Sequence, residues 1–155
     1  MDYKKYGVLL IFLMGWGVAN AAGTQPWEVP YSIEGVWKMV DDSSGSDIGN
    51  AKLWTQHDTL YGVIQEIFGK SSNGVAPVCG LCSGALKNKP LEGMRFLSGF
   101  VLRDGHWSRG KIVDFQNGKT YKGEIEQPDE NTLNVFSYIH FIIKIGRTQK
   151  WIRIE

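Results

Sequence analysis

Beyond residue 32, apolar and polar residues alternate in short stretches that are separated by turn-forming residues. In the first stretch, Trp37 and Met39 share one side, whereas Glu34 and Lys38 fall on the other. Alternation with a period of two is typical of a β-strand that has one buried and one solvated face. Eight stretches of this kind predict strands over residues 33–40, 50–56, 59–67, 94–103, 106–115, 119–126, 132–139 and 141–154.

Turn residues between these stretches indicate how the strands are connected. Asp104-Gly105 and Asn117-Gly118 are pairs that accept positive φ in two-residue hairpins, so consecutive strands are expected to be antiparallel neighbours. The sequence therefore predicts an all-β fold, an eight-stranded antiparallel up-and-down β-barrel, with a β-sandwich as the alternative. The interruption at residues 68–90 is too long for a hairpin and is expected to form a flap over one barrel end.

The first 21 residues differ in character from the rest of the chain. Lys4 and Lys5 precede an uncharged, mostly apolar stretch over residues 7–18, and Ala19-Asn20-Ala21 offers the small residues that signal peptidase recognises. The stretch is shorter than the roughly 20 apolar residues that cross a bilayer. We therefore expect a signal peptide over 1–21, an extended leader over 22–32 and a single barrel domain over 33–155. The expected location is the periplasm or the cell exterior, with no stable membrane insertion after cleavage.

Charge argues against a nucleic-acid partner. The chain carries 17 Lys and Arg against 16 Asp and Glu, and removing the two lysines and one aspartate of the first 21 residues leaves 15 of each. A neutral chain lacks the excess positive charge that drives binding to phosphate backbones.

The two cysteines, Cys79 and Cys82, lie within the predicted loop. In an oxidising compartment they are expected to form a disulfide that closes a short loop. Cys-x-x-Cys spacing also occurs in redox-active sites and, with two further ligands, in zinc sites. The βαβ context of the first is missing, and the histidines lie in separate segments, so no metal and no cofactor are expected.

The high aromatic content offers material for a binding cavity. A small barrel with an apolar interior and a few polar groups can hold one small ligand, here an apolar or carboxylate-bearing molecule. The same aromatics would equally serve to fill a solid core, with the protein then acting through its surface. The candidate lining comprises Trp37, Met39, Phe96, Phe100, Trp107, Tyr121 and Trp151, with Arg109 and Arg147 as anchors for a carboxylate.

Two further functional hypotheses rest on individual segments. Phe141-Ile142-Ile143 is apolar on both faces, which is compatible with a homodimer in which a second subunit covers one face. His106, with Asp104 and Asp114 at the ends of its hairpin, is the best acid–base candidate for a hydrolase. No nucleophile, paired carboxylates or ligand cluster accompanies it, so a catalytic role is not expected.

Several motifs agree in order and spacing with known families. Gly35-Val36-Trp37 resembles the Gly-x-Trp motif of lipocalins, whose tryptophan is covered by an arginine of the last strand, here Arg153 or Arg147. Further motifs follow along the chain: Asp41-Asp42, Leu60-Tyr61-Gly62, Cys79-x-x-Cys82, Lys89-Pro90-Leu91, Gly110-Lys111-Ile112-x-Asp114, Asn117-Gly118-Lys119-Thr120-Tyr121 and Gly146-Arg147-Thr148-Gln149-x-Trp151-x-Arg153. Together with Gly35-x-Trp37, these motifs resemble the exported bacterial family known as domain of unknown function 2147. That resemblance implies a lipocalin-like barrel without an assigned activity.

Overall fold

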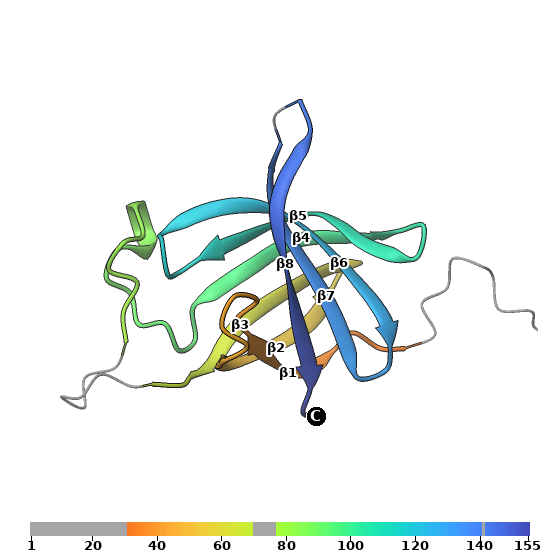
Figure 1. Cartoon of the computed structure of the whole chain (residues 1–155), viewed down its shortest axis with the longest axis horizontal. Coiled ribbons are helices and arrows are strands. Elements are labelled where there is room, and N and C mark those ends of the chain that lie inside the picture. Colours follow the sequence, from red (N-terminus) through yellow and green to blue (C-terminus); the bar gives the residue numbers. More distant parts are fainter. Residues whose placement is uncertain (1–30, 70–76, 141) are drawn as a thin grey trace, which may run out of the picture.

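The computed structural model describes residues 31–69, 77–140 and 142–155, and it contains eight strands and one short 3-10 helix (Figure 1). The helix, η1 (Gly84–Leu86), lies in the connection between the third and fourth strands. The strands are β1 (Gly35–Val40), β2 (Asp47–Gln56), β3 (Thr59–Ile67), β4 (Arg95–Arg103), β5 (His106–Asp114), β6 (Lys119–Asp129), β7 (Thr132–His140) and β8 (Lys144–Arg153).

Each strand pairs with the next in antiparallel fashion, and β1 pairs with β8, so the sheet closes on itself. The predicted eight-stranded up-and-down barrel is confirmed, and the alternative β-sandwich is excluded. Closure removes the exposed sheet edges that an open array of hairpins would present. The β1–β8 pairing is the shortest, because only Trp37, Lys38 and Met39 face partners on β8.

The strand boundaries depart from the predicted ones where turn-forming residues are part of a strand. β2 begins at Asp47 instead of residue 50, and β6 continues through Pro128 to Asp129 instead of ending at residue 126. An irregularity in the β6–β7 register between Glu126 and Asp129 accommodates the proline, which has no N–H to donate. The predicted last strand, 141–154, is observed as Lys144–Arg153, and Phe141 lies outside the described residues.

Large side chains fill most of the barrel interior. Phe100 of β4 is completely buried, and its ring lies against two glycines, Gly110 and Gly123, which face each other across β5 and β6. A Cβ atom at either glycine would overlap the Phe100 ring, so these positions leave the space that the ring occupies. The middle of the barrel is therefore a packed core.

One barrel end is closed by Trp37 and Arg153. The Arg153 guanidinium lies 4.1 Å from the centroid of the Trp37 ring, and the indole Nε1 donates to the Ile33 carbonyl at 2.9 Å. Arg153 also donates to the carbonyls of Glu130 at 2.8 Å and Glu34 at 2.9 Å. Arg153, and not Arg147, is thus the arginine that covers the tryptophan of the Gly-x-Trp motif.

The loop between β3 and β4 packs against the opposite end of the barrel. It contains the predicted disulfide between Cys79 and Cys82, and both residues are buried. A Cβ at Gly118, in the β5–β6 turn, would overlap the Leu81 backbone, so the two segments are in close contact. Because Cys79 and Cys82 belong to the main hydrophobic cluster, the loop extends the core at this end.

The predicted signal peptide and most of the predicted leader lie outside the described residues. Within the ranges that the structure describes, no helix has the length and apolar character needed to span a bilayer.

Candidate ligand-binding site

The end of the barrel opposite Trp37 and Arg153 contains a pocket. It is bounded by the last residues of β5, the β5–β6 turn, and the adjoining parts of β6, β7 and β8. Up-and-down connectivity brings these segments to the same end, because alternate connections lie at the same end of such a barrel. We call this end the mouth.

The deep part of the pocket is narrow. Its cavity volume is about 30 Å³, which corresponds to one or two water molecules. The floor is apolar and is formed by Met39, Phe96, Val135 and Trp151. The Phe96 and Trp151 rings lie with their centroids 5.9 Å apart, so they pack against each other across the interior. Without side-chain movement, the deep part admits only a small group.

The outer part of the pocket is much wider. It is an open depression of about 480 Å³, within the range of 300–1,000 Å³ that is usual for small-molecule sites. Ile145 contributes apolar surface to it. Five residues line both parts and form a polar ring between them: Asp114, Gln116, Tyr121, Ser137 and Arg147.

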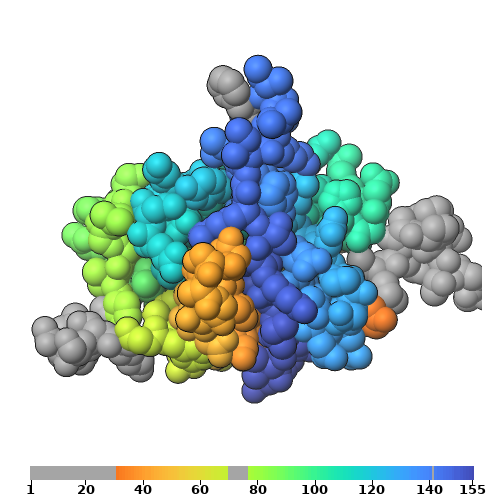
Figure 2. Space-filling model, in the orientation of Figure 1, coloured from red at the N-terminus to blue at the C-terminus, as the bar shows by residue number. Residues whose placement is uncertain are grey.

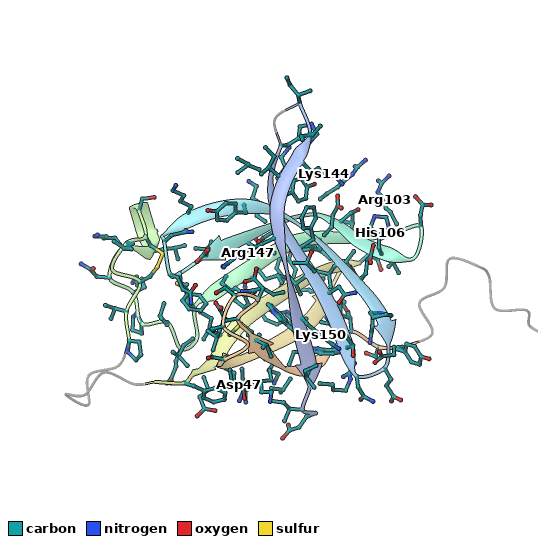
Figure 3. All side chains as sticks on the ribbon, in the orientation of Figure 1. Asp47, Arg103, His106, Lys144, Arg147 and Lys150 are labelled. Atoms are coloured by element: carbon teal, nitrogen blue, oxygen red, sulfur yellow. A yellow bond between two sulfur atoms is a disulfide. The ribbon has the colours of Figure 1, made fainter. Side chains whose placement is uncertain are left out.

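Arg147 is the cationic member of the polar ring, and it lies on β8 near the middle of the view in Figure 3. Its NH2 atom is 3.1 Å from Oδ2 of Asp114, and its NH1 atom is 3.3 Å from Oδ1 of Asp42. Ser137 is its direct cross-strand partner on β7. The guanidinium therefore bridges the β5 end and the β1–β2 hairpin across the mouth.

Asp114 is held in place by the turn that follows it. Its Oδ1 atom accepts a hydrogen bond from the Gln116 backbone N–H at 2.9 Å, and the Asn117 side-chain amide donates to Oδ2 at 2.9 Å. The same amide donates to the Tyr121 hydroxyl at 3.1 Å. These bonds fix the carboxylate that orients Arg147, so the polar ring is preorganised by the β5–β6 turn.

Asp42 is the less constrained partner of Arg147. The Asp42–Arg147 contact is the longer of the two, and the Asp42 side chain is more exposed than that of Asp114. An exposed ion pair of this kind is worth only about 0–1 kcal/mol. The NH1 atom of Arg147 is therefore the position at which an incoming anionic group can replace a protein carboxylate at little cost.

The structure brings together five of the nine predicted ligand-binding residues. Met39, Phe96, Tyr121, Arg147 and Trp151 line the pocket. Trp37, Phe100 and Trp107 are buried in the packed core instead. Arg109 is exposed and lines a groove on the outer wall of the barrel.

Apart from Tyr121 and Arg147, sequence reasoning missed the polar residues of the pocket. The sequence singles out Asp114 as one end of the hairpin that contains His106, whereas in the structure it holds the β5–β6 turn and orients Arg147. Ser137 and Gln149 occupy the same alternation phase as the buried Val135 and Trp151. A polar residue in the alternation phase of buried residues is the signal that identifies both.

The acid–base candidates of the sequence are not brought together. His106 lies at the start of β5, next to Asp104, whereas Asp114 lies at the other end of the same strand. Asp114 contacts Arg147 at the mouth, and His106 lines the outer groove. Within the described ranges, no group of three His, Cys, Asp or Glu residues is placed to hold a metal ion.

A second polar cluster lies on the outer wall, at the base of the β7–β8 hairpin. Lys144 Nζ lies 2.5 Å from Oε1 of Glu124, and the Tyr138 hydroxyl donates to the same oxygen at 3.1 Å. Burial favours a higher pKa for Glu124, but these two hydrogen bonds outweigh it and leave the pKa below its ordinary value. Burial and the bond to Glu124 raise the pKa of Tyr138, and the Glu124 carboxylate raises the pKa of Lys144.

These features define a class of protein: a lipocalin-like barrel that has one end sealed by an arginine–tryptophan contact and the other end open. Protein HP1028 of Helicobacter pylori, described as belonging to the lipocalin family, has a similar fold. The two chains are 20% identical, the TM-score is 0.68, and the match covers 81% of this chain and 84% of the other. This similarity concerns the fold.

The family is established by sequence. Residues 35–153 match a family described as an uncharacterized protein conserved in bacteria, DUF2147, and the chain belongs to that family. No match was found among curated proteins.

Proposed function

We propose that this protein binds a small molecule with an apolar body and a carboxylate head in the barrel mouth, outside the cytoplasm. The observation that carries the proposal is the polar ring: a half-buried arginine at the boundary between an open depression and an apolar floor. Eight-stranded barrels of this size hold a single small ligand when their interior is not filled. The buried disulfide is compatible with the oxidising compartment that the proposal requires.

In this proposal the residues of the mouth have separate roles. Asp114 keeps Arg147 in position, and NH1 of Arg147 binds the ligand carboxylate in place of Asp42. The apolar body lies in the outer depression against Ile145, and its end contacts the floor near Trp151. Because the deep cavity is only about 30 Å³, a long chain does not enter it fully.

The proposed replacement of the Asp42 carboxylate by that of the ligand can be tested with two ligands and two variants. Octanoate and octanol differ in the head group alone, and Trp151 provides a fluorescence signal from within the pocket. We expect octanoate to bind the natural protein more tightly than octanol. Asp42→Asn removes the competing carboxylate and should tighten octanoate binding by about twofold to fivefold. Arg147→Gln should weaken it by about tenfold or more.

Octanol binding serves as the control, because neither variant changes the apolar surfaces of the pocket. If Asp42→Asn and Arg147→Gln leave octanoate affinity unchanged, the carboxylate site is not at Arg147. If neither ligand changes the fluorescence, the proposed ligand class is wrong.

A further inference from the structure

The β7–β8 hairpin carries aliphatic side chains away from the body of the barrel. Its end rises clear of the rest of the molecule (Figures 1 and 2). Ile142 is 88% exposed and Ile143 is 66% exposed, and the cross-strand pair Ile139 and Ile145 below them is 53% and 55% exposed. We call these four residues the isoleucine tip. Exposed isoleucines on a projecting hairpin are costly in water, and contiguous apolar surface of this kind marks an interaction site.

Next to the isoleucine tip, the outer wall of the barrel is basic. Lys111 of β5 and Lys122 of β6 are directly opposed across the sheet, and both are exposed. Like charges in directly opposed positions destabilise a sheet, so this pair is retained at a cost to stability. Among the described residues, neither lysine forms an ion pair.

The two lysines line a groove of about 410 Å³ on the outer wall. His106 and Arg109 line it as well. Arg109 has a φ of 64°, in the left-handed region, at the irregularity in the β5–β6 register. The acidic residue of the groove, Glu124, is already bonded to Lys144 and Tyr138. The groove therefore presents uncompensated positive charge.

The groove lies against the β7–β8 hairpin that ends in the isoleucine tip. Tyr138 lines the groove and is the cross-strand neighbour of Lys122. Ile139 and Ile145 lie in the opposite alternation phase and face the mouth, so Ile142 and Ile143, at the end of the hairpin, are the tip residues that project beyond both faces. Lys144 lies within the tip, between Ile143 and Ile145, and its ammonium is 5.0 Å from the centroid of the Tyr138 ring. In Figure 3, Lys144 and His106 lie toward the same side of the barrel.

We propose that this surface docks on an anionic lipid bilayer, with the isoleucine tip inserted into the headgroup region and Arg109, Lys111 and Lys122 facing the lipid phosphates. A projecting aliphatic tip beside a cationic face is complementary to an apolar layer with anionic headgroups at its boundary. A second copy of the chain fits less well, because a two-fold contact over this surface would bring the basic faces toward each other. This docking surface shares Ile145 with the ligand site, but the residues changed in its tests, Ile142, Ile143, Lys111 and Lys122, do not line the mouth, so the docking proposal does not depend on the ligand proposal.

Vesicle sedimentation tests the proposal. The exported protein, with its N-terminus determined by mass spectrometry, is mixed with phosphatidylcholine vesicles or with vesicles that also contain phosphatidylglycerol. We expect stronger binding to the anionic vesicles and a decrease in that binding as salt is added. The double variant Ile142→Asp, Ile143→Asp should bind both kinds of vesicle more weakly, by about tenfold or more.

The basic face has a distinct expected effect. Lys111→Gln with Lys122→Gln should weaken binding to anionic vesicles by about tenfold or more, and should leave the weaker binding to neutral vesicles unchanged. Leu81→Asp, at a residue that is 67% exposed on the β3–β4 loop, is the matched control and should bind like the natural protein. Circular dichroism verifies that each variant is folded.

Two results would overturn the proposal. The first is that the Ile142→Asp, Ile143→Asp variant binds vesicles as strongly as the Leu81→Asp control. Absence of vesicle binding by every protein tested counts as this result. The second is a dimer in light scattering that the double aspartate variant converts to a monomer, since the tip would then be covered by a second copy.

Discussion

The guanidinium of Arg153 lies 4.1 Å from the ring centroid of Trp37 and also donates to the backbone carbonyls of Glu34 and Glu130. One side chain thus joins the start of the chain's first strand, the β6–β7 turn and the last strand. The contact seals one barrel end, and the pocket lies at the opposite end.

Removal of this contact should destabilise the whole barrel. Arg153→Ala eliminates a cation–π contact and hydrogen bonds from a charged donor, so we expect the free energy of unfolding to fall by about 2–4 kcal/mol in urea titrations. Lys150→Ala, at an exposed position on the same strand, is the control and should change stability by about 0.5 kcal/mol or less. Equal effects of the two variants would show that Arg153 does not secure the closed end.

The packing of Phe100 predicts the effect of enlarging a glycine. In Gly110→Ala the new methyl group overlaps the Phe100 ring, so the free energy of unfolding should fall by about 1–3 kcal/mol. Gly80→Ala is the matched control, since no atom lies within 4 Å of the position that its methyl group would take and the glycine has no positive φ. Combining Gly110→Ala with Phe100→Leu should recover part of the loss. A double variant whose losses simply add would contradict the packing explanation.

The Glu124 cluster predicts a pH dependence. The pKa of Glu124 is lower in the folded protein than its ordinary value of 4.5, so its carboxylate stabilises the fold above that pH. This contribution is lost as the pH falls through the lowered pKa. Thermal unfolding of the natural protein and of Glu124→Gln should therefore differ at neutral pH and converge in acid. A difference that stays constant from neutral pH into acid would exclude Glu124 as its source.

Because the disulfide is buried, we predict that it resists reduction in the folded protein. Cys79 and Cys82 lie in the hydrophobic cluster, so a reductant should reach them only when the loop opens. We expect alkylation of both thiols after treatment with a reductant in urea, and little alkylation after the same treatment under native conditions. Rapid reduction of the native protein would instead support a redox-active pair.

Alternation and turn residues were sufficient to predict the barrel, because every strand has one side that must be buried. The predicted strand boundaries are wrong where a residue typical of turns is accommodated within a strand. Glycine is typical of turns, but Gly49 lies within β2. The Glu66 backbone of the neighbouring strand approaches this position so closely that no side chain would fit there. Pro128 resembles a strand terminator, but β6 accommodates it at a register irregularity.

The site was harder to predict than the fold. Aromatic content identified the floor, with Phe96 and Trp151, but it could not separate these residues from Phe100, which fills the core. That distinction depends on Gly110 and Gly123 being opposite each other, which only the strand register reveals. The contacts of Arg147 with Asp42 and Asp114 join three segments that are distant in sequence.

Native mass spectrometry of the protein expressed in its natural host tests the central claim, that a small molecule binds in the mouth. Ser137→Phe places an aromatic side chain within the polar ring, and Thr148→Phe places the same side chain at an exposed position on β8. We predict a small-molecule adduct on the natural protein and on Thr148→Phe, and its loss from Ser137→Phe. A bare mass for all three proteins, or an adduct of equal abundance on Ser137→Phe, would contradict the claim.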